Sequence, residues 1–424
     1  MRILVIGGGG REHALCWALS RAAVVFCAPG NPGTAAVATN LPVAADDPDK
    51  LIEAVRARRL DMVVVGPEAP LAAGLVDRMA AAGVAAFGPT AAAARIEASK
   101  AFAKRLMAQA GVPTALTRTF TDTADAKRYI QGHAEPLVVK ASGLAAGKGA
   151  VVCATRVEAA EVAADMLGGR FGAAGREVLV EEFLEGEELS VFVMTDGERW
   201  MLLPASQDHK RLGDGDTGPN TGGMGAYTPV SIVTDDLLER VEQRVIGPVL
   251  GALAGAGCPY RGLLYAGLMV TPSGDPYVLE FNCRFGDPET QAVLPALDDD
   301  LATHCWRIAT RETWRPPERL PAVRAAVTTV VAARGYPDAP EKGAAITLPA
   351  DLPAETLLFH AGTARDPDGT LRVAGGRILC ATGLGPDVPT AAERSRRLAE
   401  AVTFSGRVFR RDIGWREAAR AGAS

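Results

Sequence analysis

Lys140-Ala141-Ser142-Gly143-Leu144-Ala145-Ala146-Gly147-Lys148-Gly149, followed by a Val151-Val152 pair, is the stretch that decides the fold class. It is similar to the phosphate-binding pattern GxxxxGK[ST], but Ser142 stands at the first glycine position and Gly149 replaces the metal-binding hydroxyl residue. That pattern must also open a helix, whereas a β-branched pair favours a strand. We therefore interpret the segment as a strand, a glycine loop and a second strand. Such a hairpin flap can fold over phosphates and bring Lys140 and Lys148 to them, which a bland surface hairpin would not need.

A second informative tract runs from Val278 to Gln291. In a strand, Glu280 and Asn282 project to one face and present hard oxygen ligands of the kind that suit Mg²⁺. Arg284, at the following turn, can bind a phosphate or a carboxylate through two hydrogen bonds, and Asp287 can bind an amine. The alternative is an ordinary salt bridge between Arg284 and a carboxylate. The tract predicts a metal and anion site.

The stretch from Val180 to Glu188 is the end of a predicted strand, Val178 to Glu182, followed by an acidic turn. Backbone groups at a strand end can bind the edge of an adenine, and Phe183 and Leu184 can line its pocket. A carboxylate a few residues later can accept hydrogen bonds from ribose hydroxyls. A solvated acidic turn would show the same pattern, so this motif alone is weak.

The first hundred residues alternate short β-branched runs with Ala-rich stretches, which predicts a parallel sheet with crossover helices. Its opening turn, Gly7 to Gly10, precedes a helix whose amides and dipole can hold a phosphate. Neither GxGxxG register is complete, because Glu12 or His13 stands at the third glycine position, and this disfavours a nicotinamide cofactor. A tight turn without a ligand is the alternative.

Composition excludes several classes of protein. The chain has 424 residues, of which 48 % are hydrophobic and 22 % charged, which predicts several folded domains. A net charge of -5 provides no basic surface for nucleic acid, and no apolar run approaches the length of a membrane span. The seven cysteines are scattered without CxxC pairs, which predicts reduced, mostly buried thiols in a cytoplasmic protein.

The motifs, preceded by Lys100, occur in an order that resembles ATP-grasp enzymes. The tract Arg284 to Gln291 resembles the signature of the glycinamide ribonucleotide synthetase family. Further stretches that resemble this family are Gly66 to Leu71, Ser206 to Arg211, Asp216 to Tyr227, Phe359 to Thr363 and Arg411 to Trp415. The resemblance therefore spans the whole chain.

The resemblance implies an α/β and α+β multidomain fold. It comprises an N-terminal doubly wound parallel-sheet domain, an ATP-grasp core with a small flap domain, and a C-terminal mixed β domain. The implied units are an N-terminal substrate-binding domain (1–100), a connecting helix and linker (101–113), a flap subdomain (114–188), a catalytic subdomain (189–316) and a C-terminal β-rich domain (317–424).

The resemblance also implies the activity, an ATP-dependent ligation of glycine to 5-phosphoribosylamine in purine biosynthesis, with ATP and Mg²⁺ or Mn²⁺ as cofactors. Residues implied to contact ATP are Lys100, Lys140, Gly147, Lys148, Glu181, Glu182, Phe183, Leu184 and Glu188, and the implied metal ligands are Glu280 and Asn282. Residues implied to bind substrates are Gly9, Gly10, Arg11, Glu68, Asp208, Thr221, Gly222, Gly223, Met224, Arg284, Asp287 and Pro288. Residues implied to act in catalysis are Lys148, His209, Lys210, Asn220, Arg284 and Asp287.

Two positions depart from the family pattern. Ser142 stands where an Asp is expected in the flap, and Gly267 stands where many ATP-grasp enzymes carry a further metal-binding carboxylate. Three alternative functions remain: another purine-pathway ATP-grasp enzyme such as a carboxylase or formyl transferase, a nicotinamide-dependent oxidoreductase, and a catalytically silent nucleotide-binding regulator. The Arg284 to Gln291 tract argues against another purine-pathway enzyme, and the incomplete GxGxxG pattern argues against an oxidoreductase. The retained metal ligands and flap lysines argue against a silent regulator. We predict a monomer that acts on small molecules, without nucleic acid or membrane partners.

Overall fold

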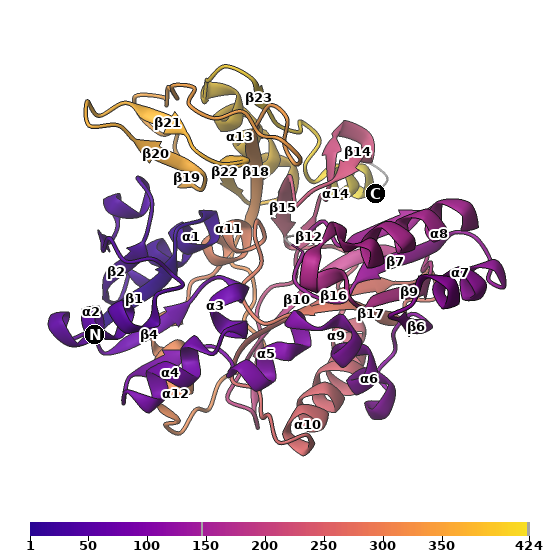
Figure 1. The fold of residues 1–424 in the computed structure, drawn as a ribbon. Helices are drawn as coiled ribbons and strands as arrows, with labels where there is room; N and C mark the ends of the chain where they lie inside the picture. Colours follow the sequence, from indigo (N-terminus) through magenta and orange to yellow (C-terminus); the bar gives the residue numbers. More distant parts are fainter. Residues whose placement is uncertain (146, 422–424) are drawn as a thin grey trace.

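The computed structural model describes residues 1–145 and 147–421, so Ala146 of the predicted flap lies outside the described residues. Four sheets of four or more strands organise the chain. In Figure 1 the N-terminal elements, the flap subdomain and the C-terminal elements surround the central strands β10, β16 and β17. This arrangement confirms the predicted mixed α/β multidomain fold.

The N-terminal unit is a five-stranded parallel sheet in the order β3-β2-β1-β4-β5. Its strands are β1 (Arg2–Gly7), β2 (Val24–Pro29), β3 (Thr39–Asn40), β4 (Met62–Val65) and β5 (Ala85–Phe87). Its helices are α1 (Gly10–Leu19), α2 (Pro48–Arg58), α3 (Glu68–Ala72), α4 (Leu75–Ala81) and α5 (Ala91–Ala98). The run Ile3 to Ile6 is fully buried, as a strand covered on both faces requires.

After α6 (Lys100–Ala110), the flap subdomain forms an antiparallel sheet in the order β6-β9-β7-β8. Its elements are β6 (Thr117–Phe120), α7 (Thr123–Gln131), β7 (Leu137–Ala141), β8 (Ala150–Cys153), α8 (Arg156–Asp165) and β9 (Val178–Glu182). Lys140 pairs with Ala150 across the β7–β8 hairpin, so the glycine segment joins two strands as predicted. The subdomain packs around its own hydrophobic cluster, separate from the larger core.

The central sheet has the order β11-β10-β16-β17. Its elements are β10 (Glu187–Thr195), β11 (Trp200–Leu202), β16 (Gly262–Val270) and β17 (Pro276–Asn282), with helices α9 (Asp235–Val241), α10 (Gly247–Gly255), α11 (Thr290–Val293) and α12 (Leu301–Thr310) nearby in sequence. One large hydrophobic cluster contains residues of both this sheet and the N-terminal sheet. The N-terminal domain and the central sheet therefore share a core.

The C-terminal unit is an antiparallel sheet in the order β12-β15-β18-β22-β19, with β23 beside β18. Its elements are β12 (Gln207–Asp208), β15 (Gly225–Thr228), β18 (Ala325–Ala333), β19 (Thr356–His360), β22 (Arg377–Gly385), α13 (Val388–Ala401), β23 (Arg407–Val408) and α14 (Trp415–Ala421). Two short pairs accompany it, β13 (Arg211–Gly213) with β14 (Thr217–Asn220) and β20 (Thr363–Arg365) with β21 (Leu371–Val373). Strands β12 and β15 come from the polar segment that we assigned by sequence to the catalytic subdomain.

Two further expectations concern the whole chain. All seven cysteines are free and buried, as their scattered positions predict. Within residues 1–145 and 147–421, every helix is too short or too polar to span a membrane.

Candidate active site

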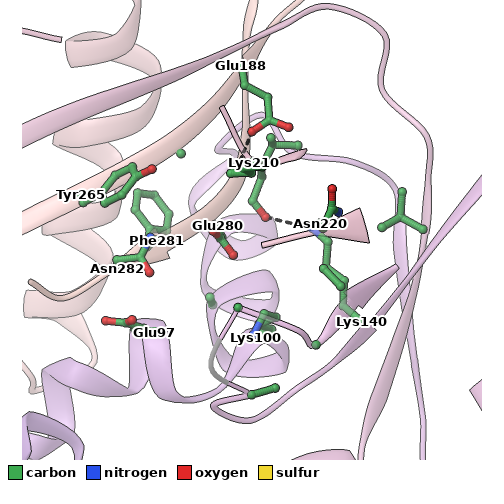
Figure 2. Close-up of a pocket in the computed structure, with 18 of the residues that line it drawn as sticks. Glu97, Lys100, Lys140, Glu188, Lys210, Asn220, Tyr265, Glu280, Phe281 and Asn282 are labelled. Carbon is green, nitrogen blue, oxygen red and sulfur yellow. Dashed lines mark hydrogen bonds and ion pairs between the residues drawn. The ribbon is translucent and has the colours of Figure 1, made fainter. Parts of the chain in front are cut away.

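A cavity of about 470 Å³ lies where the N-terminal domain, the flap subdomain, the central sheet and the C-terminal sheet meet. Its wall contains residues from all four units, including Arg11, Lys140, Glu280 and Arg377. Figure 2 shows Glu280 amid Lys100, Lys140 and Lys210, with Asn282 on the same strand. Positive and negative groups thus converge in one enclosed space, as they do in sites that bind charged ligands.

Two lysines share one buried carboxylate at the base of the flap. The Nζ of Lys104 lies 3.1 Å from Oε1 of Glu181, and the Nζ of Lys140 lies 2.9 Å from its Oε2. Glu181 is only 2 % exposed, and burial lowers the pKa of Lys104 to about 8 even though Glu181 opposes this shift. The Glu181 side chain therefore organises the lysines, while the strand end that follows it, Glu182 to Leu184, lines the cavity.

A bulge in β17 opens the strand at the predicted metal ligands. Gly267 pairs with Glu280 and Leu268 pairs with Val278, so Leu279 has no partner in the register. The carbonyl of Leu279 accepts a hydrogen bond of 3.1 Å from Lys140 Nζ. The bulge links the flap lysine to the strand that carries Glu280.

Glu280 is half-buried in the cavity wall, and it is held as a carboxylate. Burial alone would raise its pKa, but the charges of Lys210, Lys100 and other nearby cations outweigh this effect and hold the pKa below its usual value. Asn282 is 8 % exposed, and its Oδ1 accepts from Arg284 at 3.1 Å. Both residues line the cavity.

These residues fit a site for Mg²⁺ or Mn²⁺. Among the described residues, His, Cys, Asp and Glu side chains form no cluster of three that could hold a metal alone. Mg²⁺ sites often have only one or two protein carboxylates and take their remaining ligands from water and substrate phosphates. An ionised Glu280 beside an amide oxygen and near Lys100 and Lys140 matches that type of site.

A second charged group lies beside the central sheet. Lys210 forms a close ion pair with Glu188, and both line the cavity together with Asp208. Burial raises the pKa of Asp208 to about 8, and Glu289 and Glu188 add to this rise against the opposing charge of Lys210. Glu188 is thus already engaged by Lys210 in the structure, at the position that we assigned to the ribose of ATP.

Arg284 joins the metal strand to the N-terminal domain. Its Nε lies 3.3 Å from Glu68 Oε2, and its Nη2 lies 3.3 Å from Glu97 Oε1. Glu97 in turn accepts from the backbone N of Cys283 at 2.7 Å. Burial would lower the pKa of Arg284, but the two carboxylates hold it above its usual value, so the guanidinium is charged. Arg11 and Glu68 complete this side of the wall.

Asp287 has two partners for its carboxylate. Gln291 Nε2 donates to Oδ1 at 2.8 Å, and Arg377 Nη2 lies 3.2 Å from Oδ2. Arg377 Nη1 also donates to the carbonyl of Asp287 at 2.8 Å and to that of Gly222 at 2.5 Å. Asp287, which we predicted to bind substrate, is therefore held in one orientation by the Gln291 and Arg377 side chains.

The N-terminal glycine turn packs directly against this region. A Cβ at Gly10 would lie 2.6 Å from Gln291 Nε2, and a Cβ at Gly9 would lie 2.8 Å from Glu12 Oε2 and 3.8 Å from Asp287 Oδ2. Glu12 already accepts from the backbone N of Gly9. A side chain at either position would therefore displace Gln291 or Glu12, and the turn lies beside the Asp287 carboxylate.

The structure brings most of the predicted residues together. Lining the cavity are Arg11, Glu68, Lys100, Lys140, Gly147, Glu181, Glu182, Phe183, Leu184, Glu188, Asp208, Lys210, Asn220, Thr221, Gly222, Glu280, Asn282, Arg284 and Asp287. Of the described residues that we predicted, those outside the wall are Gly9, Gly10, Lys148, His209, Gly223, Met224 and Pro288.

His209 and Lys148 lie differently from what we expected. His209 is 1 % exposed, and its Nε2 accepts from the backbone N of Gly414. Burial lowers the pKa of His209 to about 3, so the ring is neutral inside the C-terminal unit. Lys148 donates instead to the carbonyl of Pro337 at 2.8 Å and lies 3.6 Å from Asp338.

The departure at Ser142 has a local explanation. Its carbonyl accepts from the backbone N of Lys100 at 2.8 Å, and its Oγ accepts from Ala101 at 3.2 Å. Ser142 thus holds the first turn of α6 against the base of the flap, as an Asp could also do.

Sequence reasoning missed several residues of the wall. They are Glu97, Lys104, Tyr265, Glu289 and Arg377. Tyr265 donates to Glu289 at 2.7 Å. The position of Glu289 within the Arg284 to Gln291 tract was an available signal, whereas Arg377 carried none.

Comparison with known proteins gives consistent results. Residues 1–97, 98–290 and 326–416 match the N, ATP-grasp (A) and C domain models of phosphoribosylglycinamide synthetase. The chain is 46 % identical over 433 residues to phosphoribosylamine–glycine ligase of Vibrio vulnificus, covering 99 % of each. It is similar to the crystal structure of phosphoribosylamine–glycine ligase from Thermotoga maritima, with a TM-score of 0.86 and 36 % identity over 97 % of this chain and 100 % of that one.

A more distant similarity concerns the fold alone. The biotin carboxylase domain of a Hydrogenobacter thermophilus 2-oxoglutarate carboxylase, solved with MgADP and bicarbonate, is 17 % identical with a TM-score of 0.73. It covers 96 % of this chain and 91 % of that one.

Proposed function

Because the chain belongs to the phosphoribosylglycinamide synthetase family, we propose that it joins glycine to 5-phosphoribosylamine, with cleavage of ATP to ADP and phosphate. The observation that carries this proposal is the convergence of Glu280, the three lysines around it and the Arg284 group on one cavity. We further propose that it acts as a monomer in the cytoplasm on small-molecule substrates, as a step of purine biosynthesis.

In the proposed reaction, the glycine carboxylate attacks the γ-phosphorus of ATP and ADP leaves. The resulting glycyl phosphate has an activated carbonyl, which the amine of phosphoribosylamine attacks with loss of phosphate and a proton. No enzyme nucleophile is needed. Phosphoryl transfer depends mainly on alignment and on neutralising charge, so Lys100 and Lys140 are proposed to hold the phosphates.

The adenine is proposed to lie against the strand end Glu182 to Leu184, with its ribose near Glu188. The Mg²⁺ that Glu280 and Asn282 would hold neutralises phosphate charge when bound. Beside Asn282, Arg284 would bind the glycine carboxylate, and Asp287 would bind its ammonium group.

The remaining predicted residues belong to the proposed substrate end of the cavity. Asp208, Lys210, Asn220 and Thr221 line it from the β12–β15 segment, and Arg11 and Glu68 line it from the N-terminal domain. We propose that phosphoribosylamine binds between these two sides.

Measurement of ADP release with glycine and freshly prepared phosphoribosylamine tests this function. We expect turnover only when ATP, glycine and phosphoribosylamine are all present, together with a product whose mass equals glycinamide ribonucleotide. Omission of each substrate in turn is the control. Turnover with bicarbonate or formate in place of glycine would instead assign a carboxylase or formyl transferase, and no ADP release under any condition would indicate a regulator.

A further inference from the structure

Arg377, the first residue of β22, connects three segments that are far apart in sequence. Its Nη1 donates to the carbonyls of Gly222 and Asp287, and its Nη2 pairs with the Asp287 carboxylate. The side chain is 21 % exposed and lines the cavity. A planar guanidinium with several donors can serve acceptors on two segments at once, which an ammonium group cannot match in geometry.

A second contact holds the backbone of Gly222 through its N–H group. The backbone N of Gly222 donates to the hydroxyl of Tyr336 at 3.0 Å. A Cβ at Gly222 would lie 3.2 Å from that hydroxyl and 3.4 Å from Arg377 Cζ, so the two side chains enclose the glycine closely. Residue Gly222 is thus bonded through both its backbone N–H and its backbone C=O to the C-terminal domain.

We propose that Arg377 is a positioning residue for the glycine-binding end of the site, which acts by holding the Asp287 carboxylate and the Gly222 peptide in fixed relative positions. The inference rests on the proposed function, because it takes Asp287 as the anchor of the substrate ammonium. Gln291 fixes Oδ1 of Asp287 and Arg377 fixes Oδ2, so the carboxylate is oriented before glycine arrives. A preoriented anchor avoids the entropy cost of ordering it during binding.

Arg377→Gln tests this role in the full chain. Hydrogen bonds to charged groups contribute enough that we expect the KM for glycine to rise about tenfold to a hundredfold. The KM for ATP should stay within about twofold, because the nucleotide end of the cavity is independent of this contact. In the Arg377→Gln background, Asp287→Asn should raise the KM for glycine less than it does in the wild type, since the pair is already broken.

The matched control is Arg372→Gln, which removes a half-buried arginine of the same domain that lies outside the cavity wall and whose Nε lies 2.5 Å from Asp366. It should leave all three KM values unchanged. If Arg377→Gln fails to fold, Tyr336→Phe is the alternative variant, because it removes the hydroxyl that accepts from the backbone N of Gly222. A selective rise in the KM for glycine is again expected.

Three results would overturn the inference: equal losses for glycine and ATP, full additivity of Arg377→Gln and Asp287→Asn, or an Arg377→Gln variant with unaltered KM values. A wild-type protein without glycine-dependent ADP release would overturn the proposed function instead. Wild-type turnover combined with an unaltered Arg377→Gln variant would overturn this inference alone.

Discussion

Replacement of Glu181 by Gln removes the one carboxylate that two buried lysines share. The Lys104 and Lys140 side chains are each 8 % exposed, and their Nζ atoms lie 3.1 Å and 2.9 Å from the Glu181 oxygens. Gln keeps the size of the side chain but removes its charge, and one end of its amide presents a donor to a lysine that is also a donor. The change therefore leaves two positive charges facing each other in a buried site.

The size of the effect follows from the burial of all three groups. Removing one partner of a buried ion pair costs about 3–5 kcal/mol, because the remaining charge loses its compensation. Burial already lowers the pKa of Lys104 to about 8 with Glu181 present. Loss of the Glu181 charge should lower that pKa further, so that Lys104 relieves part of the cost by releasing its proton. We expect a net destabilisation of about 3 kcal/mol at pH 7.

Urea denaturation of the full chain, with and without a non-hydrolysable ATP analogue, measures this effect. Phosphates bound near Lys140 would supply negative charge, so the analogue should stabilise Glu181→Gln more than it stabilises the wild type. The control is Asp125→Asn, which removes an exposed ion pair of 2.6 Å with Arg128 in the same subdomain and should cost at most about 1 kcal/mol. A Glu181→Gln variant as stable as this control would refute the reasoning.

Three other outcomes are expected. Glu280→Gln should reduce ligation at least about a hundredfold with unchanged far-UV circular dichroism, because it removes a proposed metal ligand rather than core volume; near wild-type turnover at saturating Mg²⁺ would contradict the assignment. Amide exchange at Gly147 and Gly149 should slow when nucleotide binds, because phosphates give the flap new partners; equal exchange rates would show a rigid hairpin. Burial and the nearby His360 lower the pKa of His13 to about 3, so the unfolded chain binds more protons below pH 6.5 and stability falls there. From pH 7 to pH 5 this loss should be about 2 kcal/mol, and smaller in His13→Asn by urea denaturation; an unchanged pH dependence would place the effect elsewhere.

Local patterns determined the elements of this protein and the type of its site. A strand covered on both faces must be apolar throughout, so the run Ile3 to Ile6 identified β1 without any knowledge of its neighbours. The β-branched pair after the glycine segment identified a hairpin rather than a helix. Glu280 and Asn282 stand two residues apart on one strand, and that spacing placed both in the cavity wall.

Contacts between distant parts of the chain were decided only by the tertiary structure. Glu181 belongs to a motif that predicted an adenine pocket, yet its carboxylate pairs with Lys104, a helix residue without any motif. The family resemblance implied a catalytic role for His209, but its ring lies against Gly414. Periodicity shows which residues share a face of one element, and it carries no information about which face of another element will meet it.

Arg377 is the clearest example of a contact that the sequence does not predict. Its neighbours along the chain are Gly376 and Ile378, which mark a turn and a buried strand and give no indication of an active site. It reaches the cavity because β22 pairs with β18 and the C-terminal sheet packs beside the Asp287 turn. The sequence by itself determined the strands and the chemical groups that they carry. Which charge meets which carboxylate was decided by packing, since Coulomb energy depends on the distance between atoms and not on their separation along the chain.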